Sequence, residues 1–365
     1  MYDYLIVGAG LFGAVFAYEA SQNNKRCLVI DKKSHMGGYV FCENIEGITT
    51  HKYGARIFHT NDKNIWEYVN RFAEFNRFTN MPIANYNNEL YNLPFNMNTF
   101  YKLWGVTTPE AARKIIEEQR SGVAQPENLE QLAISIVGTD IYDKLVKGYI
   151  EKIWGKKCTE LPTSAVNILP VKFNFDNDYF GDRYQGVPIG GYNQIITKLL
   201  ESCDVKLDSD FFNDAARYRY IADRIIFTGK IDEFYGYCYG PLEYKSLCFE
   251  TEILDTPNYQ GNAIVNYTSA DVPFTRIIEH KHFEYGTQEK TVITREYPIG
   301  WMRGSEPCYP VSDEKNVSIY NKYLTLARQE KNVIFGGRLG TYRHLNMSQA
   351  INNALKYAYS QFRHR

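Results

Sequence analysis

The sequence predicts an α/β protein: a parallel sheet built from both ends of the chain, an α-helical insertion, and a second, antiparallel sheet. Three observations lead to this fold class. Residues 4–31 read as strand, glycine turn, helix and strand. Residues 97–154 show helical periodicity, and residues 203–300 return to short β-branched and aromatic runs typical of strands. Blocks of this kind indicate a layered α/β domain that is interrupted by further elements.

Composition limits the class of protein. The chain has 365 residues, 44% of them apolar, which is enough for a large core and more than one domain. The formal net charge of -1 argues against a general nucleic-acid binder. The seven cysteines are scattered without a C-x-x-C pair, which favours free thiols over a metal site or a disulfide framework. No apolar run reaches the roughly 18 residues of a membrane span, so we expect a cytoplasmic protein without membrane insertion.

The first unit carries the most specific local pattern. The β-type run at residues 4–7 leads into "GAGLFG", then a helix, then a second strand that ends at Asp31. In this pattern Gly8 makes the tight turn, Gly10 lets a pyrophosphate approach the backbone, and Gly13 lets helix and strand pack closely. The helix N-terminus faces the phosphates, and the acid accepts from ribose hydroxyls. The unit predicts dinucleotide binding; a plain βα turn is the alternative.

A glycine pair shortly after Asp31 bears on which dinucleotide binds. Gly37 and Gly38 follow the acid at a short spacing. This arrangement resembles the second fingerprint of FAD enzymes of the amine-oxidase and glutathione-reductase type, which NAD enzymes usually lack. We therefore predict FAD rather than NAD, with a structural turn as the alternative.

The remaining elements follow from periodicity and turn signals. In chain order we expect strands around a turn at 39–60, a helix at 61–75, a hairpin at 80–95, helices at 97–154, a surface loop at 160–185, strands within 203–300, a strand at 332–335, a glycine turn at 336–340 and a final helix from Met347 to Gln361 capped by Asn346. Because the last strand and helix resemble the first unit, we expect them to return to the nucleotide-binding domain.

Three domains follow from this order. The predicted Rossmann-like FAD-binding domain is discontinuous, comprising 1–80, 190–240 and 315–365. The predicted α-helical domain is 97–160. The predicted β-sheet substrate domain combines 80–96, 161–190 and 241–314.

Eight segments in order carry a family resemblance: "YLIVGAGLFGAVFA", "HKYGARIFHTND", "FNRFTN", "LYNLPFNMNTF", "LVKGYIEKIWG", "FNFDNDYFGDRYQGVPIGGY", "FTRIIEHKHF" and "VIFGGRLG". On these the chain resembles the UDP-galactopyranose mutases over its whole length. The resemblance implies an isomerase that interconverts UDP-galactopyranose and UDP-galactofuranose and supplies furanose sugar for surface polysaccharide such as O antigen. It implies reduced FAD, whose N5 attacks the anomeric carbon; the adduct opens to an iminium, and the sugar recloses through O4.

The resemblance gives the segment "THKYGARIFHT" a role. In this family it lies against the flavin ring, so it needs small residues for close approach and polar groups that tune N5 and hold the sugar. It needs no protein nucleophile, which fits its lack of carboxylate and thiol. We expect His59, Arg56 and Arg276 to support the chemistry. The alternative is that His51 and His59 are structural histidines.

The resemblance also implies the residues that bind ligands, and no metal. The expected cofactor-binding residues are Gly8, Gly10, Leu11, Phe12, Gly13, Asp31, Lys32, Gly37, Gly38, His51, Tyr53, Arg56, Ile57, Thr228, Gly337, Arg338, Asn346 and Met347. The expected substrate-binding residues are Phe58, His59, Asn80, Tyr149, Trp154, Phe173, Tyr179, Tyr184, Lys245, Asn266, Arg276, Tyr309 and His344. Arginine and tyrosine suit a diphosphate because both donate to its oxygens. Salt-bridged arginines and packed tyrosines are the alternative.

The chain departs from the family pattern in its predicted pocket. The departing residues are Arg56, Ile153, Ile168, Lys245, His344 and Asn346, where the family usually has other polar or charged side chains. These changes leave open whether the sugar is galactose, and dTDP-fucopyranose or UDP-N-acetylgalactosamine is the alternative substrate. They leave the predicted fold and the FAD requirement unchanged.

Two other classes of protein share the predicted fold. One is an FAD oxidoreductase of the amine-oxidase type, and the other is a flavoprotein that has lost activity. The set of tyrosine, arginine and tryptophan residues suits a nucleotide diphosphate better than an apolar amine. We therefore expect a nucleotide-diphosphate sugar as the partner molecule, and a homodimer.

Overall fold

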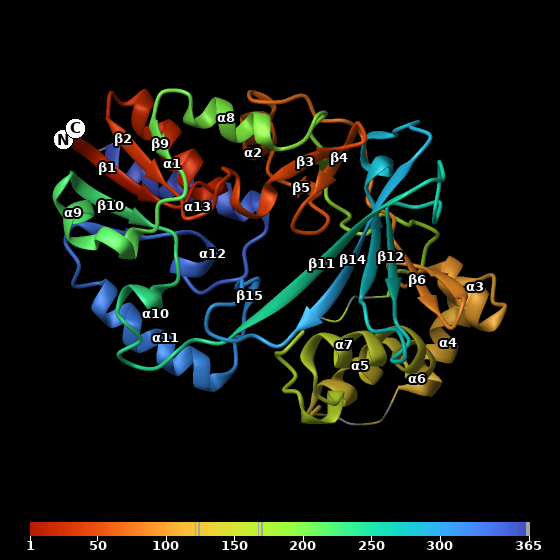
Figure 1. The fold of residues 1–365 in the computed structure, drawn as a ribbon. Coiled ribbons are helices and arrows are strands. Elements are labelled where there is room, and N and C mark those ends of the chain that lie inside the picture. The colour runs from red at the N-terminus through yellow and green to blue at the C-terminus, as the bar shows by residue number, and fades with distance from the viewer. Residues whose placement is uncertain (121, 123–124, 167, 169–170, 363–365) are drawn as a thin grey trace.

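The first sheet joins strands from three distant parts of the chain. The computed structural model describes residues 1–362 except 121, 123–124, 167 and 169–170. Five strands lie in the order β16 (Val333–Phe335), β10 (Ala222–Phe227), β1 (Tyr2–Val7), β2 (Cys27–Ile30) and β9 (Asp204–Lys206), all paired in parallel (Figure 1). The Rossmann-like sheet is therefore assembled from the N-terminal, central and C-terminal segments, and the N-terminus lies at its side of the molecule.

Helices cover both faces of this sheet. One face carries α1 (Leu11–Gln22), α8 (Asn193–Leu200) and α13 (Met347–Phe362), and the other carries α9 (Ala215–Tyr220), α10 (Ile231–Phe234) and α11 (Glu314–Ala327). Neighbouring β1 residues point to opposite faces: Ile6 joins the core under α1, and Leu5 joins the core under α11. The sheet is therefore buried on both sides, as parallel sheets require.

The chain also contains short elements outside the two large sheets and the main helices. They are η1 (Gly38–Val40), β3 (Cys42–Ile45), β4 (Ile48–His51), β5 (Phe58–Thr60), α2 (Lys63–Asn70), η3 (Cys158–Glu160), β8 (Tyr184–Gly186), η4 (Phe211–Asp214), η5 (His280–Glu284) and α12 (Gly337–Gly340). The helix expected at 61–75 begins as predicted, because Asp62 accepts from the backbone N–H of Asn64. It is shorter than predicted, because the chain is extended again where Phe75 bridges to Pro188. Likewise, the glycine turn expected at 336–340 contains one helical turn, α12.

The second sheet forms the middle of the molecule. Its order is β15 (Tyr309–Pro310), β11 (Tyr244–Leu254), β14 (Thr291–Ile299), β13 (Arg276–Glu279), β12 (Ile264–Tyr267), β6 (Ile83–Tyr86) and β7 (Glu89–Asn92). The sheet is antiparallel, as expected, except that β12 and β6 pair in parallel. These two strands belong to hairpins that are far apart in sequence, so no tight turn fixes their relative direction.

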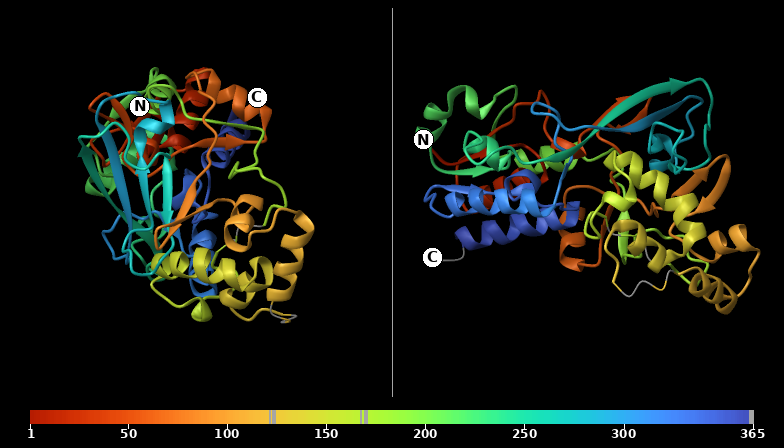
Figure 2. Two further views of the ribbon diagram at one scale, coloured as in Figure 1. Left: turned by 90° about the vertical axis from the view of Figure 1, so that its right-hand side faces the viewer. Right: turned by 90° about the horizontal axis from the view of Figure 1, so that it is seen from below.

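The helical block lies beside the second sheet, on the side away from the first (Figures 1 and 2). It comprises α3 (Met97–Trp104), α4 (Pro109–Gln119), α5 (Leu129–Val137), α6 (Thr139–Ile141), the π-helical η2 (Tyr142–Lys147) and α7 (Gly148–Trp154). Residues 121 and 123–124 of the expected helical region, residues 167 and 169–170 of the expected loop, and residues 363–365 lie outside the described residues.

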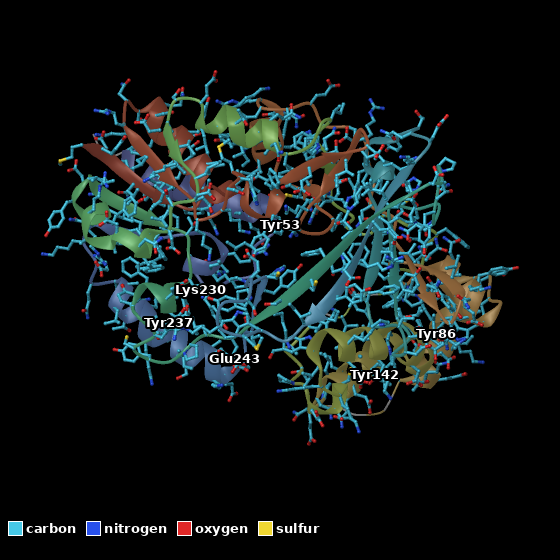
Figure 3. The ribbon with its side chains drawn as sticks, in the orientation of Figure 1. Tyr53, Tyr86, Tyr142, Lys230, Tyr237 and Glu243 are labelled. Carbon is cyan, nitrogen blue, oxygen red and sulfur yellow. The ribbon has the colours of Figure 1, made fainter. Side chains whose placement is uncertain are left out.

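Two of the three apolar cores lie on the two faces of the first sheet, and the third lies beneath the helical block and the β6–β7 hairpin. The domain boundaries given above stay a prediction. Figure 3 shows Tyr142 in the helical block, far from Lys230 and Tyr237 on the α10–α11 side of the first sheet. Of the helices in the described part of the chain, none is both long and apolar enough to cross a bilayer.

Candidate active site

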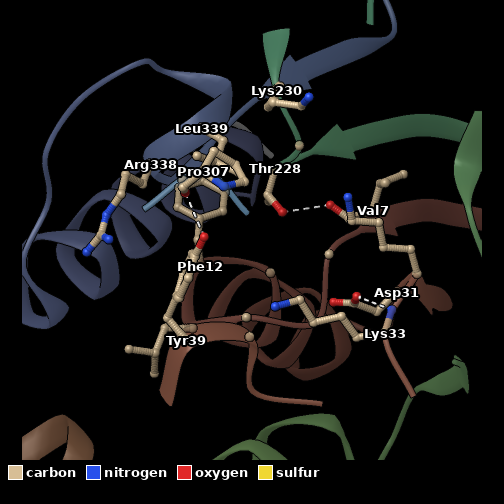
Figure 4. A pocket seen from close by; sticks show the side chains of 18 of the residues that line it. Val7, Phe12, Asp31, Lys33, Tyr39, Thr228, Lys230, Pro307, Arg338 and Leu339 are labelled. Atoms are coloured by element: carbon tan, nitrogen blue, oxygen red, sulfur yellow. Dashed lines mark hydrogen bonds between the residues drawn. The ribbon is translucent and has the colours of Figure 1, made fainter. Parts of the chain in front are cut away.

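The glycine-rich pocket lies at the carboxyl ends of β1, β2 and β10 (Figure 4). It contains most of the predicted cofactor-binding residues: Gly8, Gly10, Leu11, Phe12, Gly13, Asp31, Lys32, Gly37, Gly38, Arg56, Thr228, Gly337, Arg338, Asn346 and Met347. In parallel α/β sheets this edge is where ligands bind, because helix N-termini and loop amides converge there.

Three glycines of the first turn meet different requirements. Gly8 has a φ of +109°, and a Cβ on it would lie 2.0 Å from Thr228 Oγ1. A Cβ on Gly13 would lie 2.1 Å from the carbonyl oxygen of Gly8. A Cβ on Gly10 would meet no protein atom within 4 Å, although Gly10 lines the pocket. Gly8 and Gly13 are therefore required by packing, whereas Gly10 keeps pocket space free at the start of α1.

Two backbone N–H groups hold the Asp31 carboxylate in place. Its Oδ2 accepts from the N–H of Ala9 at 2.8 Å, and its Oδ1 accepts from the N–H of Lys33 at 2.9 Å. The carboxylate thus ties the end of β2 to the glycine turn while it lines the pocket. Gly10 caps α1 without a side-chain hydrogen bond, so no side-chain acceptor covers the first turn of that helix.

Sequence reasoning missed the rim of this pocket. Lys33 Nζ lies 2.8 Å from Glu306 Oε1, and the Tyr39 hydroxyl donates to the carbonyl of Pro307 at 2.6 Å. Ser209, Lys230 and Glu306 also line the pocket. Residues 306–307 follow β14 by several residues and carry no motif, so only the fold brings them to β2.

The second pocket lies between the first sheet, the second sheet and the helical block. It contains the predicted residues Arg56, Ile57, His59, Asn80, Tyr149, Tyr179, Asn266, Arg276, Arg338, Tyr309, His344, Asn346 and Met347. It also contains residues that sequence reasoning missed, namely Pro82, Leu93, Phe95, Leu145, Phe180, Ile264 and Thr268. Of the apolar ones, only Leu145 in η2 and Ile264 in β12 lie in helices or strands, and the others lie in connecting segments that carry no periodicity.

The two pockets meet. Arg56, Arg338, Leu345, Asn346 and Met347 line both of them. A ligand in the glycine-rich pocket and a ligand in the second pocket would therefore touch the same five residues, here called the junction.

Arg276 is the main cation of the second pocket. Its Nη2 donates to the Tyr149 hydroxyl at 2.6 Å, and its Nε lies 3.3 Å from Glu296 Oε1. Burial lowers the pKa of Arg276, but Glu296 and Tyr149 more than offset this, so its pKa is raised and it stays charged. Burial also raises the pKa of Tyr149, which keeps its hydroxyl protonated as a donor. Asn266, opposite Arg276 in β12, has a buried Oδ1 without a partner among the described residues.

The junction holds two fixed guanidinium groups. Arg56 Nε donates to the carbonyl of Tyr39 at 2.9 Å, and Arg56 Nη2 donates to that of Tyr53 at 2.7 Å. Arg338 donates to the carbonyls of Cys308 and Leu345, each at 2.9 Å. Main-chain carbonyls thus orient both cations without neutralising them. Burial lowers the pKa of Arg338, and the charge of Arg56 lowers it further.

The environment of His344 follows from these charges. Burial lowers the pKa of His344, and Arg338 and Arg56 lower it further. The imidazole is therefore neutral near pH 7. It lies against the ring of Tyr309, with the ring centroids 5.2 Å apart.

Seven predicted site residues lie outside both pockets: His51, Tyr53, Phe58, Trp154, Phe173, Tyr184 and Lys245. Phe58 belongs to the core of the first domain, and Tyr184 stacks on Trp66. Lys245 Nζ lies over the Trp154 ring at 4.6 Å from its centroid. Their predicted roles stay predictions.

The remaining members of this group are held by other parts of the protein. His51 is buried and stacks on Phe283. The Tyr53 hydroxyl lies 2.8 Å from His35 Nε2. Phe173 lies under the guanidinium of Arg113. The departing residue Ile168 packs against the helical core and lines neither pocket.

Comparison with known proteins gives two family matches. A family model described as "GLF: UDP-galactopyranose mutase" matches residues 144–344, and one described as "NAD(P)-binding Rossmann-like domain" matches residues 6–72. The second match covers the glycine turn, Asp31 and the glycine pair.

Relatives match over almost the whole chain. A Klebsiella pneumoniae protein named "Probable UDP-galactopyranose mutase" is 37% identical over 97% of this chain and 93% of its own. The dTDP-fucopyranose mutase of Escherichia coli is 35% identical over 97% of both chains.

Solved structures share the fold. A crystal structure of reduced UDP-galactopyranose mutase has a TM-score of 0.79 at 16% identity, over 99% of this chain and 94% of that chain. A putrescine oxidase bound to putrescine has a TM-score of 0.56 at 13% identity, over 99% of both chains.

Proposed function

Because the chain belongs to the UDP-galactopyranose mutase family, and is by that membership an isomerase, we propose that it interconverts the pyranose and furanose forms of a nucleotide sugar with the help of reduced FAD. UDP-galactopyranose is the first candidate substrate. One observation carries the proposal: a dinucleotide-type pocket and a cationic, tyrosine-lined pocket meet at the junction. A cofactor and a nucleotide sugar can therefore touch each other while each is held separately.

The residues of the glycine-rich pocket fit FAD. The space that a Cβ on Gly10 would fill lies at the start of α1, where the main chain can approach a pyrophosphate. Asp31 lines the pocket where an adenosine ribose would lie, with acceptor capacity left beyond its two backbone contacts. Arg56 and Arg338 supply positive charge where the pocket meets the second one. When bound and reduced, the flavin supplies a nucleophilic nitrogen that a protein side chain would otherwise have to provide.

The second pocket fits a nucleotide diphosphate. Arg276 stays charged, and Tyr149 stays protonated, so both can donate to phosphate oxygens. The Tyr149 hydroxyl accepts from Arg276 and keeps its own proton free to donate. The buried Oδ1 of Asn266 has no partner among the described residues and can accept from a ligand. These groups bind and orient the substrate with its sugar toward the junction.

The lining of the second pocket also supports a cofactor-borne nucleophile. Among the described residues that line it there is no carboxylate, thiol or amine. Covalent catalysis by protein groups most often uses one of these, and otherwise a histidine or a hydroxyl activated by a neighbouring base. The proposed division of labour is that the protein holds and orients the reactants while the cofactor provides the bond-forming atom.

A second sugar is favoured by a specific observation. The dTDP-fucopyranose mutase of Escherichia coli is nearly as similar to the chain as the Klebsiella protein is, at 35% against 37% identity. Arg56 places an additional cation at the junction, where the sugar would meet the cofactor. dTDP-fucopyranose is therefore the second candidate, and UDP-N-acetylgalactosamine is a third within the same chemistry. We further propose a cytoplasmic homodimer that supplies furanose sugar for a surface polysaccharide.

The proposal is tested by product analysis. The purified protein is loaded with FAD, reduced with dithionite and incubated separately with UDP-galactopyranose, UDP-N-acetylgalactosamine and dTDP-fucopyranose. We expect the furanose form of one nucleotide sugar to appear by chromatography. Bleaching of oxidised flavin by an added amine, without any furanose product, would instead indicate an oxidoreductase of the amine-oxidase type.

A further inference from the structure

We propose that His59 carries a proton between two oxygens of the sugar during ring contraction, and that Asp182 positions His59 for this task. The inference rests on the proposed function and goes beyond it, because it assigns a proton carrier among the protein side chains. It concerns His59 on β5 and Asp182 in the loop that precedes β8, the strand that pairs with β5.

Ring contraction requires a proton to move. Going from pyranose to furanose, the bond between C1 and O5 breaks and its electron pair stays on O5, which takes up a proton. A lone pair of O4 then forms the new bond to C1, and O4 gives up its proton. One proton has moved from O4 to O5, with no net oxidation or reduction. A group that first gives a proton and then takes one back completes the cycle unchanged.

Few described side chains of the second pocket can do this. The lining has no carboxylate, thiol or amine. Burial raises the pKa of both Tyr149 and Tyr179, which makes these hydroxyls poor acids near neutral pH. His344 is a poor base, because burial and two neighbouring guanidinium groups lower its pKa. His59 is the other histidine in this lining.

His59 is held in a defined orientation. Its Nδ1 lies 2.6 Å from Asp182 Oδ2, so Nδ1–H donates to the carboxylate. Its ring stacks on Phe180 with the centroids 3.7 Å apart and an angle of 5° between the planes. Asn61 Nδ2 donates to the other oxygen of Asp182, which fixes the carboxylate as well. A histidine that donates from Nδ1 to a carboxylate presents Nε2 for proton transfer.

The Nε2 atom of His59 is accessible. His59 lines the second pocket, whereas Asp182 does not. Within the described part of the chain Nε2 has no hydrogen-bond partner, and it is not among the buried polar atoms that lack one. It is therefore open to solvent or to a ligand. In the proposed step the imidazolium gives its Nε2 proton to O5 as C1–O5 breaks, and the neutral ring takes the O4 proton as C1–O4 forms.

The experiment separates proton transfer from the steps before it. Ring contraction is followed by chromatography. Cleavage and re-formation of the bond between C1 and the diphosphate are followed separately, as migration of an ¹⁸O label from the bridging to a non-bridging phosphate oxygen. Label migration needs no proton transfer between O4 and O5. The holoenzyme is used, reduced with dithionite.

Three variants are compared with the wild-type protein. His59→Asn can still donate to Asp182 but lacks the atom that corresponds to Nε2. Asp182→Asn keeps the shape of the side chain and removes the charge that selects the tautomer. Asp178→Asn is the matched control, because this carboxylate in the same loop accepts from Phe180 N–H and Gln185 Nε2 and has no hydrogen bond with His59.

We expect His59→Asn to lower kcat for ring contraction about 10²–10⁴-fold while label migration continues. Asp182→Asn should lower kcat with little change in KM, and ¹⁵N NMR of the imidazole should show loss of the Nδ1–H tautomer. The NMR measurement needs neither substrate nor turnover. Asp178→Asn should keep the tautomer and the ratio of the two rates.

Three results would overturn the inference. One is unchanged ring contraction in His59→Asn. Another is an equal loss of label migration and ring contraction in that variant, which would place His59 at the earlier step. The third is an unchanged tautomer and rate in Asp182→Asn. If the wild-type protein shows neither label migration nor ring contraction with any of the three nucleotide sugars, it is the proposed function that fails.

Discussion

Arg56 shows how a single residue can decide specificity. Its guanidinium is oriented by the carbonyls of Tyr39 and Tyr53, so the charge has a fixed position at the junction. We predict that Arg56→His changes the ratio of kcat/KM between two nucleotide sugars about tenfold, because a histidine ring cannot bond both carbonyls or hold the cation there. The measurement compares the three sugars under reducing conditions. Ile168→Arg is the control, since Ile168 packs against the helical core and should alter no ratio. Unchanged ratios of kcat/KM in Arg56→His would mean that the junction does not discriminate between the sugars.

A second residue makes stability depend on pH. His280 accepts at Nδ1 from the backbone N–H of His51 and donates from Nε2 to Thr294, so the fold requires its neutral form. Burial lowers the pKa of His280 to about 3. Because the folded-state pKa lies below the unfolded value of about 6.5, the stabilisation is present above that value and is lost as pH falls toward 3, by up to about 1.4 kcal/mol per pH unit.

We therefore expect the free energy of unfolding to fall between pH 6.5 and 4, and to fall less steeply in His280→Asn. Urea unfolding at several pH values measures how steeply the free energy of unfolding of the wild-type protein and of His280→Asn changes with pH. Subtracting one slope from the other removes the contribution of the carboxyl groups, which the two proteins share. Equal slopes would show that His280 is not the titrating group.

At the scale of elements, close approach of α7 to the second sheet positions Tyr149. A Cβ on Gly148 would lie 2.3 Å from the carbonyl oxygen of Thr268, which is backbone and cannot move aside cheaply. We predict that Gly148→Ala lowers stability by about 1–3 kcal/mol and raises KM, because α7 must shift and carries Tyr149 away from Arg276. Thermal unfolding and steady-state kinetics test this. Gly300→Ala is the control, since its added Cβ meets no atom within 4 Å. An unchanged KM in Gly148→Ala would show that the packing of α7 against the second sheet does not affect substrate binding.

At the scale of the whole molecule, the assembled pocket should hold non-covalent FAD and give a yellow protein. A Cβ at position 10 would meet no protein atom within 4 Å, so Gly10→Leu would begin its side chain in the open space at the start of α1. We predict a folded apoprotein with an unfolding temperature close to that of wild-type protein without cofactor, measured by absorbance and calorimetry. A Gly10→Leu protein that keeps its flavin would contradict this assignment of the pocket.

The meeting of the two pockets also predicts that ring interconversion depends on the redox state of the cofactor. We expect ring interconversion with dithionite and none in air, because the oxidised flavin is not a nucleophile and the second pocket supplies no carboxylate, thiol or amine among its described residues. Equal rates under the two conditions, followed by chromatography, would exclude the proposed role of the flavin.

The sequence by itself determined the features that depend on local chain chemistry. The turn at residues 8–13 needs glycine because neighbouring backbone and side-chain atoms leave no room for a Cβ at Gly8 and Gly13, and such a requirement is visible as a spaced motif. The parallel strands, the Asp62 cap and the final helix after Asn346 followed from the same kind of signal. The family followed from long matching segments, which the family model and the relatives confirm.

Only the tertiary structure decided the contacts between distant segments. Glu306 reaches Lys33, Asp182 orients His59, and β6 pairs in parallel with β12, although no local pattern links these residues. The meeting of the two pockets at Arg56 and Arg338 is of the same kind. Sequence pattern reports what a residue requires of its near neighbours, whereas a site made of side chains more than a hundred residues apart depends on how the sheets and helices pack.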